Sequence, residues 1–559
     1  MSRFEAYTGA ASYPTPLNPG SPVAAVLASG VMAKTPKQGP ELSFESELFE
    51  AADNLRGSVE SAEYKHLVLG LIFLKYISDS FERRRKALEE ETHKAGSPLF
   101  TEDDEERQEI LEDRDEYIGE YVFWVPEEAR WERVLAAAST PEIGRKLDDA
   151  LEAIESDNRE QLRGVLPRIY ARAPLPPEKL GELVSTIGRI GFGDDEQKAR
   201  DILGRTYEYF IKTFAKSEGH RGGEFYTPAP VTRLLVEMLQ PYEGRVFDPA
   251  CGSCGLFTQS GAFVEAHGGR KQEISIYGQE LNQATWRIGR MNLAIHGLSG
   301  HIAGGASSLT DDQHPSLKAD FVLANPPFNA KRWGADQVQD DVRWKYGMPP
   351  DSNANYAWIQ HFVHHLAPDG RAGFVLANGS LTSTASGEGG IREGLIRDDL
   401  VDCIVALPAQ LFYTTGIPVC LWFLDRSKTS EGERDRRGET LFLDARQMGE
   451  KISRTQIELT DAEIEKLVRT YSAWRGQDGA GDYNDEPGFC ASVDLRQIEQ
   501  QGFTLSPGRY VGAPEEEEDE VAFEERMAEL VETLETEMNE NERLAGEVRK
   551  ALERVGYGD

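Results

Sequence analysis

The stretch from Arg245 to Phe257 has the pattern of a buried strand that ends in a glycine turn and continues into a helix. Asp248 ends the strand, and Gly252 and Gly255 allow a tight turn and the close approach of a ligand, because they carry no Cβ. These are the parts of a nucleotide-type site in a doubly wound α/β domain. The turn matches neither GxGxxG nor GxxxxGK[ST], and its acid would repel phosphate. The sequence therefore favours a ligand with a cationic group or with hydroxyls.

Two later stretches are also predicted strands, and each ends in polar residues. Ile274 to Glu280 is β-patterned and ends in an acid, which is placed to hydrogen-bond ribose hydroxyls. Asp320 to Phe328 is a further strand that ends in the turn Asn325-Pro-Pro-Phe328. Taken together and in this order, the three motifs resemble the S-adenosylmethionine-dependent amino-methyltransferases that methylate adenine N6 in DNA.

This resemblance implies an α/β fold, with a class I S-adenosylmethionine-dependent methyltransferase (Rossmann-like) domain between an N-terminal helical domain and a C-terminal helical tail. It implies S-adenosylmethionine as the cofactor. The cofactor-binding residues that it implies at the strand ends are Asp248, Gly252, Ser253, Cys254, Gly255, Glu280 and Ser307. Ser307 stands where the family often has an acid that contacts the cofactor adenine, and Asp311 or Asp312 are alternatives to it.

A second cofactor segment is implied before the glycine turn. In the family, the stretch that corresponds to Arg221–Pro230 packs against the methionine end of the cofactor. Its residues here are Glu224, Phe225, Tyr226, Thr227 and Pro228. A plain alternative is that Thr227 caps a helix and Pro228 is its first residue. Because this stretch precedes the glycine turn and Asn-Pro-Pro-Phe follows it, the motif order resembles the methylation subunits of type I restriction-modification systems.

The glycine turn also contains the pair Cys251 and Cys254. A CxxC at a strand–helix junction can be a redox pair or half of a zinc site. No second CxxC or CxxH follows, which disfavours zinc. The family usually has a small residue or glycine at position 254, so the cysteine is a departure from its pattern.

The chemistry is expected at Asn325, Pro326, Pro327 and Phe328. The Asn325 side-chain oxygen and the Pro326 carbonyl can accept hydrogen bonds from an adenine amino group, and consecutive prolines stiffen the loop. Phe328 offers a face on which an extruded base can stack. By resemblance, Phe412 or Tyr413 forms a second wall, against the alternative of core packing. The alternative for Asn-Pro-Pro is a rigid turn.

No metal is expected for this reaction. His361, His364 and His365 lie at i, i+3 and i+4 of a predicted helix from Tyr356 to Leu366, a spacing that can bind metal. Few acids are near them in the sequence, so we interpret them as an ordinary helix face.

Five segments are predicted along the chain. They are a disordered arm (1–40), an N-terminal helical domain (41–190), the methyltransferase domain (191–428), a C-terminal extension (429–514) and an acidic coiled-coil-like tail (515–559). From Phe523 onward, mostly apolar positions recur at alternating steps of four and three, which is typical of a coiled-coil seam. The family's C-terminal helices pack on a DNA-specificity subunit, whereas the alternative is a helix that packs on its own domain.

Net charge limits the partners that the chain can bind alone. With 61 basic and 96 acidic residues, the net charge is −35, a poor match for a protein that grips DNA phosphates alone. Double-stranded DNA is therefore expected to meet a local basic patch or a surface supplied by a partner. The resemblance implies a specificity subunit, two copies of this chain per specificity subunit, and a separate restriction (translocase/nuclease) subunit. Five cysteines and no long apolar run favour a cytoplasmic protein with no membrane segment.

Other functions are compatible with some of these residues. Methyltransferases that act on a protein glutamine amide or on RNA use similar Asn-Pro-Pro-aromatic turns, and only the resemblance separates adenine N6 from cytosine N4. A non-catalytic scaffold could keep the fold. The helical N-terminal domain and the tail argue against a protein or RNA substrate, and the intact set of Asp248, Glu280 and Asn325 argues against a scaffold.

Overall fold

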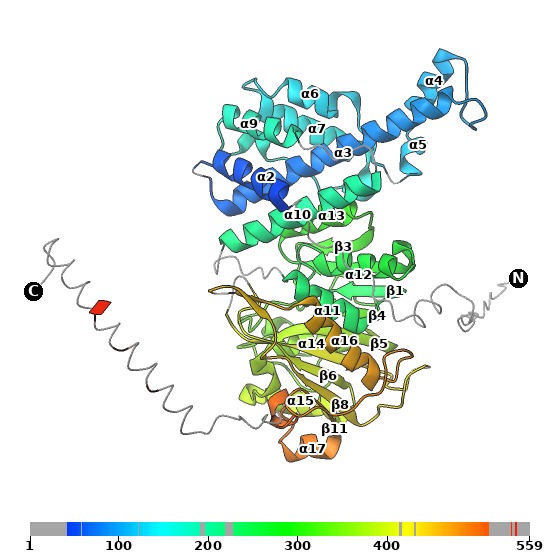
Figure 1. The fold of residues 1–559 in the computed structure, drawn as a ribbon. Helices are drawn as coiled ribbons and strands as arrows, with labels where there is room; N and C mark the ends of the chain where they lie inside the picture. The colour runs from blue at the N-terminus through cyan, green and yellow to red at the C-terminus, as the bar shows by residue number, and fades with distance from the viewer. Residues whose placement is uncertain are drawn as a thin grey trace, which may run out of the picture. The chain divides into compact units, whose positions relative to one another are not determined.

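A nine-stranded mixed sheet forms the centre of the fold, with the strand order β11-β8-β6-β7-β5-β4-β1-β2-β3 (Figure 1). This computed structural model describes residues 42–57, 59–120, 122–189, 196–218, 227–412, 416–429, 432–454 and 456–513, and the positions 531, 538, 543 and 544. The strands of the sheet are β1 (Gly244–Asp248), β2 (Ile274–Glu280), β3 (Gly300–Gly304), β4 (Ala319–Ala324), β5 (Leu366–Ala377), β6 (Val401–Ala406), β7 (Val419–Asp425), β8 (Glu439–Asp444) and β11 (Cys490–Asp494). A separate hairpin pairs β9 (Glu450–Ser453) with β10 (Gln456–Glu458).

The strand directions identify the fold class. β1 pairs in parallel with β2 on one side and with β4 on the other, and Val246 lies opposite both Ile276 and Phe321. The chain adds β2 and β3 on one side of β1 and then returns to add β4 and β5 on the other. β7 runs antiparallel to both β5 and β6. The run β3-β2-β1-β4-β5-β7-β6 is that of the class I S-adenosylmethionine-dependent methyltransferase fold, so the fold prediction is confirmed.

Helices cover both faces of the sheet. The side chains of each strand alternate between the two apolar cores that lie on these faces. In β1, Val246 and Phe247 are both fully buried but belong to opposite cores. One face is covered by α11 (Ala229–Leu239), α12 (Gly255–Ala266), α13 (Gln283–Ile295) and α16 (Asp461–Trp474), and the other by α14 (Asn355–His365), α15 (Glu388–Arg397) and α17 (Leu495–Gln500).

The N-terminal part of the chain is helical, as the sequence predicts. Its helices are α2 (Leu42–Leu55), α3 (Ser61–His93), α4 (Asp104–Leu111), α5 (Asp115–Ile118), α6 (Trp131–Ala136), α7 (Ile143–Asp157), α8 (Arg159–Leu162), α9 (Pro177–Gly188) and α10 (Glu196–Glu218). α3 packs on α10 and α13 (Figure 1). Polar contacts join this part to α13: the Arg287 side chain donates to the Gly164 carbonyl (3.1 Å) and Arg290 to the Gln161 carbonyl (2.7 Å).

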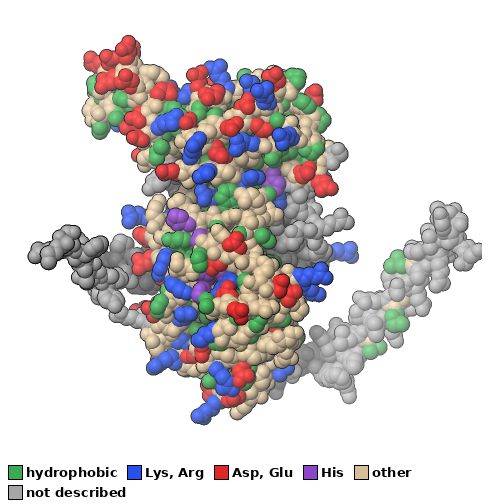
Figure 2. Space-filling view, turned by 180° about the vertical axis from the view of Figure 1, so that it is seen from behind, with side chains coloured by type: hydrophobic (Ala, Val, Ile, Leu, Met, Phe, Trp, Pro, Cys, Tyr) green, Lys and Arg blue, Asp and Glu red, His purple; other side chains and the backbone are tan. Residues whose placement is uncertain are grey.

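The acidic run from Glu102 to Glu116 forms α4 and α5 beside the far end of α3. Most of its acidic side chains are exposed, so this run forms a solvated helix face. Figure 2 shows acidic side chains gathered on the protruding end of the molecule that these helices form. Asp103 caps α4 by accepting from the Glu105 and Glu106 amides, so the negative charge also suits the helix N-terminus.

The sequence analysis did not predict β3, β8, β11 or the hairpin of β9 and β10. β3 is short and bordered by glycines at Gly300 and Gly304, which weaken any local strand signal, and its place comes from pairing with β2. β8 and β11 add two strands beyond β6, so part of the segment from 429 to 514 belongs to the same sheet as the segment before it. The proposed division of the chain into five segments stays a prediction.

The structure separates into one unit from Met1 to Val511 and a second from Gly512 to Asp559. The predicted disordered arm and nearly all of the predicted coiled coil lie outside the described residues. Val531, Met538 and Leu544 are helical and about half exposed. Within the described ranges, no helix is long and apolar enough to cross a membrane.

A buried arginine tests whether an ion-pair network stabilises the half of the sheet that contains β6 and β7. Arg436 is fully buried and pairs with Asp402, with Asp425 at 3.0 Å and with Glu433 at 2.6 Å. We expect Arg436→Met to lower the free energy of unfolding by about 3–5 kcal/mol, because it leaves buried carboxylates without their partner. Urea unfolding measures this change.

The neighbouring Arg437 is the matched control. It is exposed and pairs only with Asp435 among the described residues, so Arg437→Met should leave the unfolding midpoint nearly unchanged. An equal loss of stability in both variants would show that the buried network does not hold this half of the sheet.

Candidate active site

A cavity of about 610 Å³ opens where β1, β2 and β4 end at their carboxyl ends. This is the topological switch point of the sheet, where ligands bind in doubly wound folds. Residues from all the predicted strand-end motifs line it. They are Thr227, Asp248, Gly252, Ser253, Gly255, Glu280, Ser307, Asn325 and Pro327. Stretches that are separated by up to 100 residues in the chain thus converge on one space.

Some predicted site residues do not line this cavity. These are Pro228, Cys254, Pro326, Phe328 and Phe412. Glu224, Phe225, Tyr226 and Tyr413 lie outside the described residues. The Thr227 capping prediction is wrong by one position, because α11 begins at Ala229 and Pro228 occupies the N-cap position. The Thr227 hydroxyl accepts a hydrogen bond from Asn325 instead.

Asp248 ends β1 almost completely buried, at 1 % exposure. Its Oδ1 accepts a hydrogen bond from the Ala250 amide at 2.9 Å. Burial, together with the smaller effect of the nearby Glu280 charge, raises the pKa of this carboxyl to about 8, although the Ala250 amide opposes the shift. A buried acid of this kind favours a cationic group beside it, since a cation would restore its charged form.

The glycine turn after β1 leaves open space toward the cavity. Gly252 has a φ of +53°, and a Cβ added at Gly252 or Gly255 would meet no atom within 4 Å. The turn is fixed from behind, where the Asn292 amide group donates to the Ser253 carbonyl at 2.8 Å. It therefore forms a rigid cradle with its backbone exposed to the cavity, as a closely bound ligand requires.

The backbone conformation at Cys254 explains why glycine suits this position in the family. Its φ is +63°, in the left-handed region that glycine adopts without strain. Its side chain is 1 % exposed and does not line the cavity. A hydrogen bond with the neighbouring Cys254 thiol, and then burial, raise the pKa of Cys251. Buried thiols with a raised pKa are poor nucleophiles, which disfavours the redox interpretation of this pair.

Glu280 joins the second strand to the glycine turn. Its Oε2 accepts from the Gly252 amide at 2.9 Å, and its Oε1 accepts from the Asn282 amide at 2.7 Å. Asn282 in turn caps α13. Glu280 also lines the cavity, so its carboxylate stands between the end of β2 and the glycine turn at the cavity wall.

Among the three candidates after β3, only Ser307 lines the cavity. Asp312 is occupied elsewhere, by His365 Nε2 at 2.9 Å and by the His314 amide. The neighbouring Ser308 hydroxyl donates to the Pro249 carbonyl at 2.6 Å, which ties this segment to the end of β1.

Asn325 is the most informative residue of the site. Its amide nitrogen donates to the Thr227 hydroxyl at 2.8 Å. Its side-chain oxygen Oδ1 is buried and accepts no hydrogen bond from the described residues. A buried oxygen without a donor costs free energy, so such atoms mark places where a ligand completes the hydrogen bonding.

The two predicted stacking residues contact each other. The rings of Phe328 and Phe412 lie edge to face with centroids 5.8 Å apart, and both are nearly buried. They come from segments on either side of β5, so their meeting is a tertiary contact. The pair lies beside the Asn-Pro-Pro turn but outside the lining of the cavity.

The sequence analysis missed several lining residues. Lys65 comes from α3, and Glu208 and Ile211 come from α10, so the helical part of the chain forms one wall. Arg332 and Trp333, from the loop after Asn-Pro-Pro-Phe, form another. No local pattern marks these residues, because only the packing of α3 and α10 on α13 brings the first group to the cavity.

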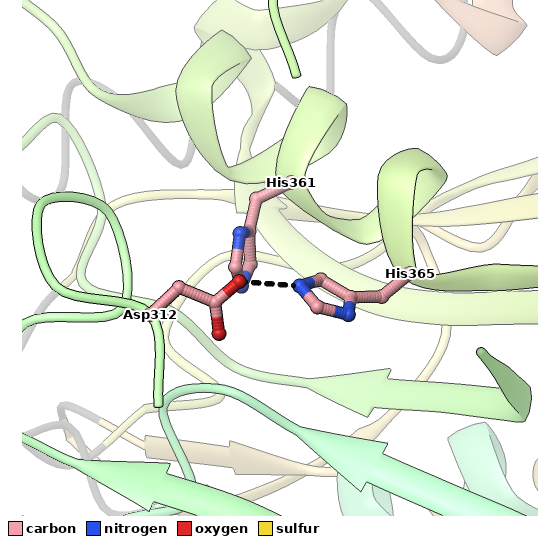
Figure 3. Close-up of side chains that lie close together, drawn as sticks. All are labelled: Asp312, His361 and His365. Atoms are coloured by element: carbon pink, nitrogen blue, oxygen red, sulfur yellow. Dashed lines mark hydrogen bonds and ion pairs between the residues drawn. The ribbon is translucent and has the colours of Figure 1, made fainter. Parts of the chain in front are cut away.

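Outside the cavity, Asp312 meets His361 and His365 (Figure 3). One ligand atom from each lies within 4.8 Å of the others, a grouping that could hold a metal ion. Both histidines are fully buried, so they are not an ordinary helix face, and their acid comes from 53 residues before His365. The hydrogen bonds favour protons over a metal: both nitrogens of His365 face acceptors, and Arg343 donates to His361 Nδ1, which leaves the ring proton on Nε2.

Two family models match this chain. The N-6 DNA methylase model matches residues 198–519, and the HsdM N-terminal domain model matches residues 44–187. The chain belongs to the N-6 DNA methylase family, among the methylase subunits of type I restriction-modification systems.

Full-length relatives agree with this assignment. The MjaIX methylase subunit of Methanocaldococcus jannaschii is 40 % identical over 520 residues, 92 % of each chain. The HindI methylase subunit of Haemophilus influenzae is 44 % identical over 423 residues, 74 % of this chain and 93 % of that protein. A crystal structure of a type I methyltransferase subunit from Streptococcus thermophilus superposes with a TM-score of 0.67 at 25 % identity, covering 84 % of this chain and 99 % of that one.

Two glycine substitutions separate ligand binding from folding. Gly255→Val adds a side chain into open space, so we expect an unchanged melting temperature but at least about a tenfold weaker binding of S-adenosylmethionine. In Gly289→Ala, the added Cβ would lie 2.7 Å from Cys254 Sγ and 2.8 Å from the Gly252 carbonyl, so this variant should lose stability. Melting temperatures with and without the ligand measure both effects. Wild-type affinity in Gly255→Val would exclude the turn as the ligand cradle.

Proposed function

We propose that the chain transfers the methyl group of S-adenosylmethionine to N6 of adenine in double-stranded DNA, as the modification subunit of a type I restriction-modification complex. The observation that carries this proposal is the buried Asn325 Oδ1, which lacks a donor among the described residues and belongs to the Asn-Pro-Pro-Phe turn. An amino group with two hydrogens is the kind of partner that this oxygen requires.

The cavity suits S-adenosylmethionine in volume and in its polar groups. Asp248 lies where it can face the ammonium group, and the Glu280 carboxylate lines the same cavity, where it can face the ribose hydroxyls. Ser307 can accept a hydrogen bond from the cofactor adenine, and Gly252 and Gly255 leave the space that a Cβ would fill. When bound, S-adenosylmethionine supplies a methyl group on a sulfonium leaving group.

The side chains at the end of β4 would prepare the target nitrogen. The lone pair of an adenine amino group is delocalised into the ring, so the group is a weak nucleophile. Asn325 Oδ1 and the Pro326 carbonyl would accept its two hydrogens and draw it toward tetrahedral geometry. The nitrogen held in this way would accept the methyl group that bound S-adenosylmethionine supplies, and it would lose one proton to solvent. Catalysis by these residues is mainly positioning.

Thr227 supports this geometry from the cofactor side. Its hydroxyl accepts from the Asn325 amide nitrogen, which fixes the amide orientation and leaves the oxygen available for the substrate. An adenine must leave the helix stack to reach Asn325. We infer that the extruded base enters against the pair of Phe328 and Phe412.

Partners are needed for DNA recognition. The net charge of −35 makes strong unassisted binding to DNA unfavourable. We propose that a specificity subunit supplies sequence recognition and contacts the C-terminal helices, where Val531, Met538 and Leu544 are exposed apolar side chains. Two copies of the chain would serve one specificity subunit in the cytoplasm, and a restriction subunit would carry out cleavage.

The proposal is tested by transfer of labelled methyl to duplex DNA, with the chain alone and with its specificity subunit. We expect label in adenine N6 only when the partner is present. Asn325→Ala should lower kcat by about 10²–10³-fold, because it removes one hydrogen-bond acceptor from the reacting nitrogen, while S-adenosylmethionine binding persists.

Three outcomes would contradict parts of the proposal. Label in DNA without the partner would exclude delegated recognition. Binding of S-adenosylmethionine without any label in DNA would favour a protein amide or RNA as the substrate. Absence of cofactor binding would indicate a scaffold that keeps only the fold.

Cofactor binding should depend on pH through Asp248. Its pKa near 8 means that the empty site binds a proton at neutral pH, whereas a bound ammonium group favours the carboxylate. Affinity for S-adenosylmethionine should therefore rise with pH up to about 8 and fall about tenfold per unit below it. Calorimetry in buffers of different ionisation enthalpy measures the released proton. Asp248→Asn is the control and should bind with an affinity that does not change across this range.

A further inference from the structure

Arg343 lies in the loop between β4 and α14, and its side chain is only 5 % exposed. All five N–H groups of its guanidinium have an acceptor. The acceptors are Asp341 Oδ1 (2.9 Å) for Nε, the Ser308 carbonyl (2.9 Å) and His361 Nδ1 (3.0 Å) for Nη1, and the Leu309 carbonyl (2.7 Å) and Asp341 Oδ2 (2.7 Å) for Nη2. Only a planar fork with five donors can satisfy this set.

Two of these acceptors belong to the cofactor wall. The carbonyls of Ser308 and Leu309 follow directly after Ser307, and all three residues line the cavity. Gln279 holds the same segment from β2, by donating to the Ala306 and Asp311 carbonyls at 3.0 and 2.8 Å. Arg343 thus holds the segment from the opposite side, in the direction of the loop after Asn-Pro-Pro-Phe.

The other side of Arg343 leads to the substrate wall. Its guanidinium lies 5.0 Å from the ring of Trp344, and Trp344 packs edge to face on Trp333 with centroids 5.7 Å apart. Trp333 lines the cavity together with Pro327, next to the catalytic turn. Its indole N–H donates to the Pro350 carbonyl at 2.9 Å, which fixes the ring. A continuous chain of contacts therefore runs from the cofactor segment through Arg343 to the wall beside Pro327.

Two histidines of helix α14 join this chain of contacts. His361 accepts from Arg343, and one turn later His365 binds Asp312 at the end of the cofactor segment (Figure 3). Burial and the charges of His365 and Arg343 hold the pKa of His361 well below its usual range, so the ring is neutral and Nδ1 is free to accept. The ring nitrogens that could bind a metal are thus used in hydrogen bonds, with Arg343 donating to His361 and His365 facing Asp312.

We propose that Arg343 is a positioning residue that locks the cofactor wall at Ser307–Leu309 to the substrate wall at Trp333. It touches neither cofactor nor base in this arrangement and acts through the two segments that do. The inference rests on the proposed function for its effect on methyl transfer. Without the fork, each segment keeps its own anchors, but their relative position is no longer set.

The test compares Arg343→Lys with Arg392→Lys. Arg392 is also buried and donates to the Phe503 carbonyl at 2.7 Å and the Tyr356 hydroxyl at 3.2 Å, but neither of these acceptors lines the cavity. Lysine keeps the charge and loses the fork in both variants. Circular dichroism establishes that each variant is folded at the temperature of measurement.

Two readouts follow, one without any ligand. Hydrogen exchange should increase at 306–309 and 333–338 in Arg343→Lys and not in Arg392→Lys. The dissociation constant for S-adenosylmethionine should rise about tenfold in Arg343→Lys and stay within about twofold in Arg392→Lys. The exchange result tests the positioning role even if the chain methylates no DNA, so failure of the proposed function is distinguishable from failure of this one.

A second pair of variants guards against a misfolded lysine variant. His361→Asn places an amide oxygen near the position of Nδ1 and should keep wild-type exchange and affinity. His361→Leu removes the acceptor, so it should increase hydrogen exchange at the same segments and weaken the affinity. Unchanged exchange and affinity in Arg343→Lys, or equal changes in Arg343→Lys and Arg392→Lys, would overturn the proposal. So would equal behaviour of His361→Asn and His361→Leu.

Discussion

The site depends on the parallel pairing of β1 with a strand on each of its two sides. Because β2 and β4 flank β1 in parallel, the carboxyl ends of all three meet at one edge of the sheet. Each strand delivers one polar side chain there: Asp248, Glu280 and Asn325. The backbone ladder fixes their spacing before any ligand binds, so the positions of the two carboxylates and the amide are properties of the sheet.

Second contacts then orient each of these groups. The Gly252 amide binds Glu280, and the Thr227 hydroxyl binds Asn325. The second contact leaves the Asn325 side-chain oxygen without a donor among the described residues. The site is thus organised by what its own hydrogen bonds leave unused, and the buried oxygen of Asn325 is the clearest case.

The sequence could predict the parts of the site that have local signatures. Asp248 and the glycines interrupt an apolar run, and Asn325 follows another, so their strand-end positions could be read from the residues alone, and the class I fold followed from the resemblance. Lys65, Trp333 and Arg343 have no such signature, because packing between distant segments gives them their roles. β3 was missed for the same reason, since its glycines give no strand signal and pairing with β2 decides its conformation. The prediction of Thr227 as the N-cap of α11 was wrong because its hydroxyl takes part in a tertiary hydrogen bond from Asn325.

The acidic lobe formed by α4 has an effect that is independent of any contact it makes. Its exposed carboxylates stand at the protruding end of α3 (Figure 2). Near a DNA duplex they are repelled by the phosphates over a Debye length of about 8 Å at physiological ionic strength. The repulsion exerts a torque that turns this end of the molecule away from the duplex during diffusional approach. Encounters are therefore biased in orientation, and added salt would make them more nearly random.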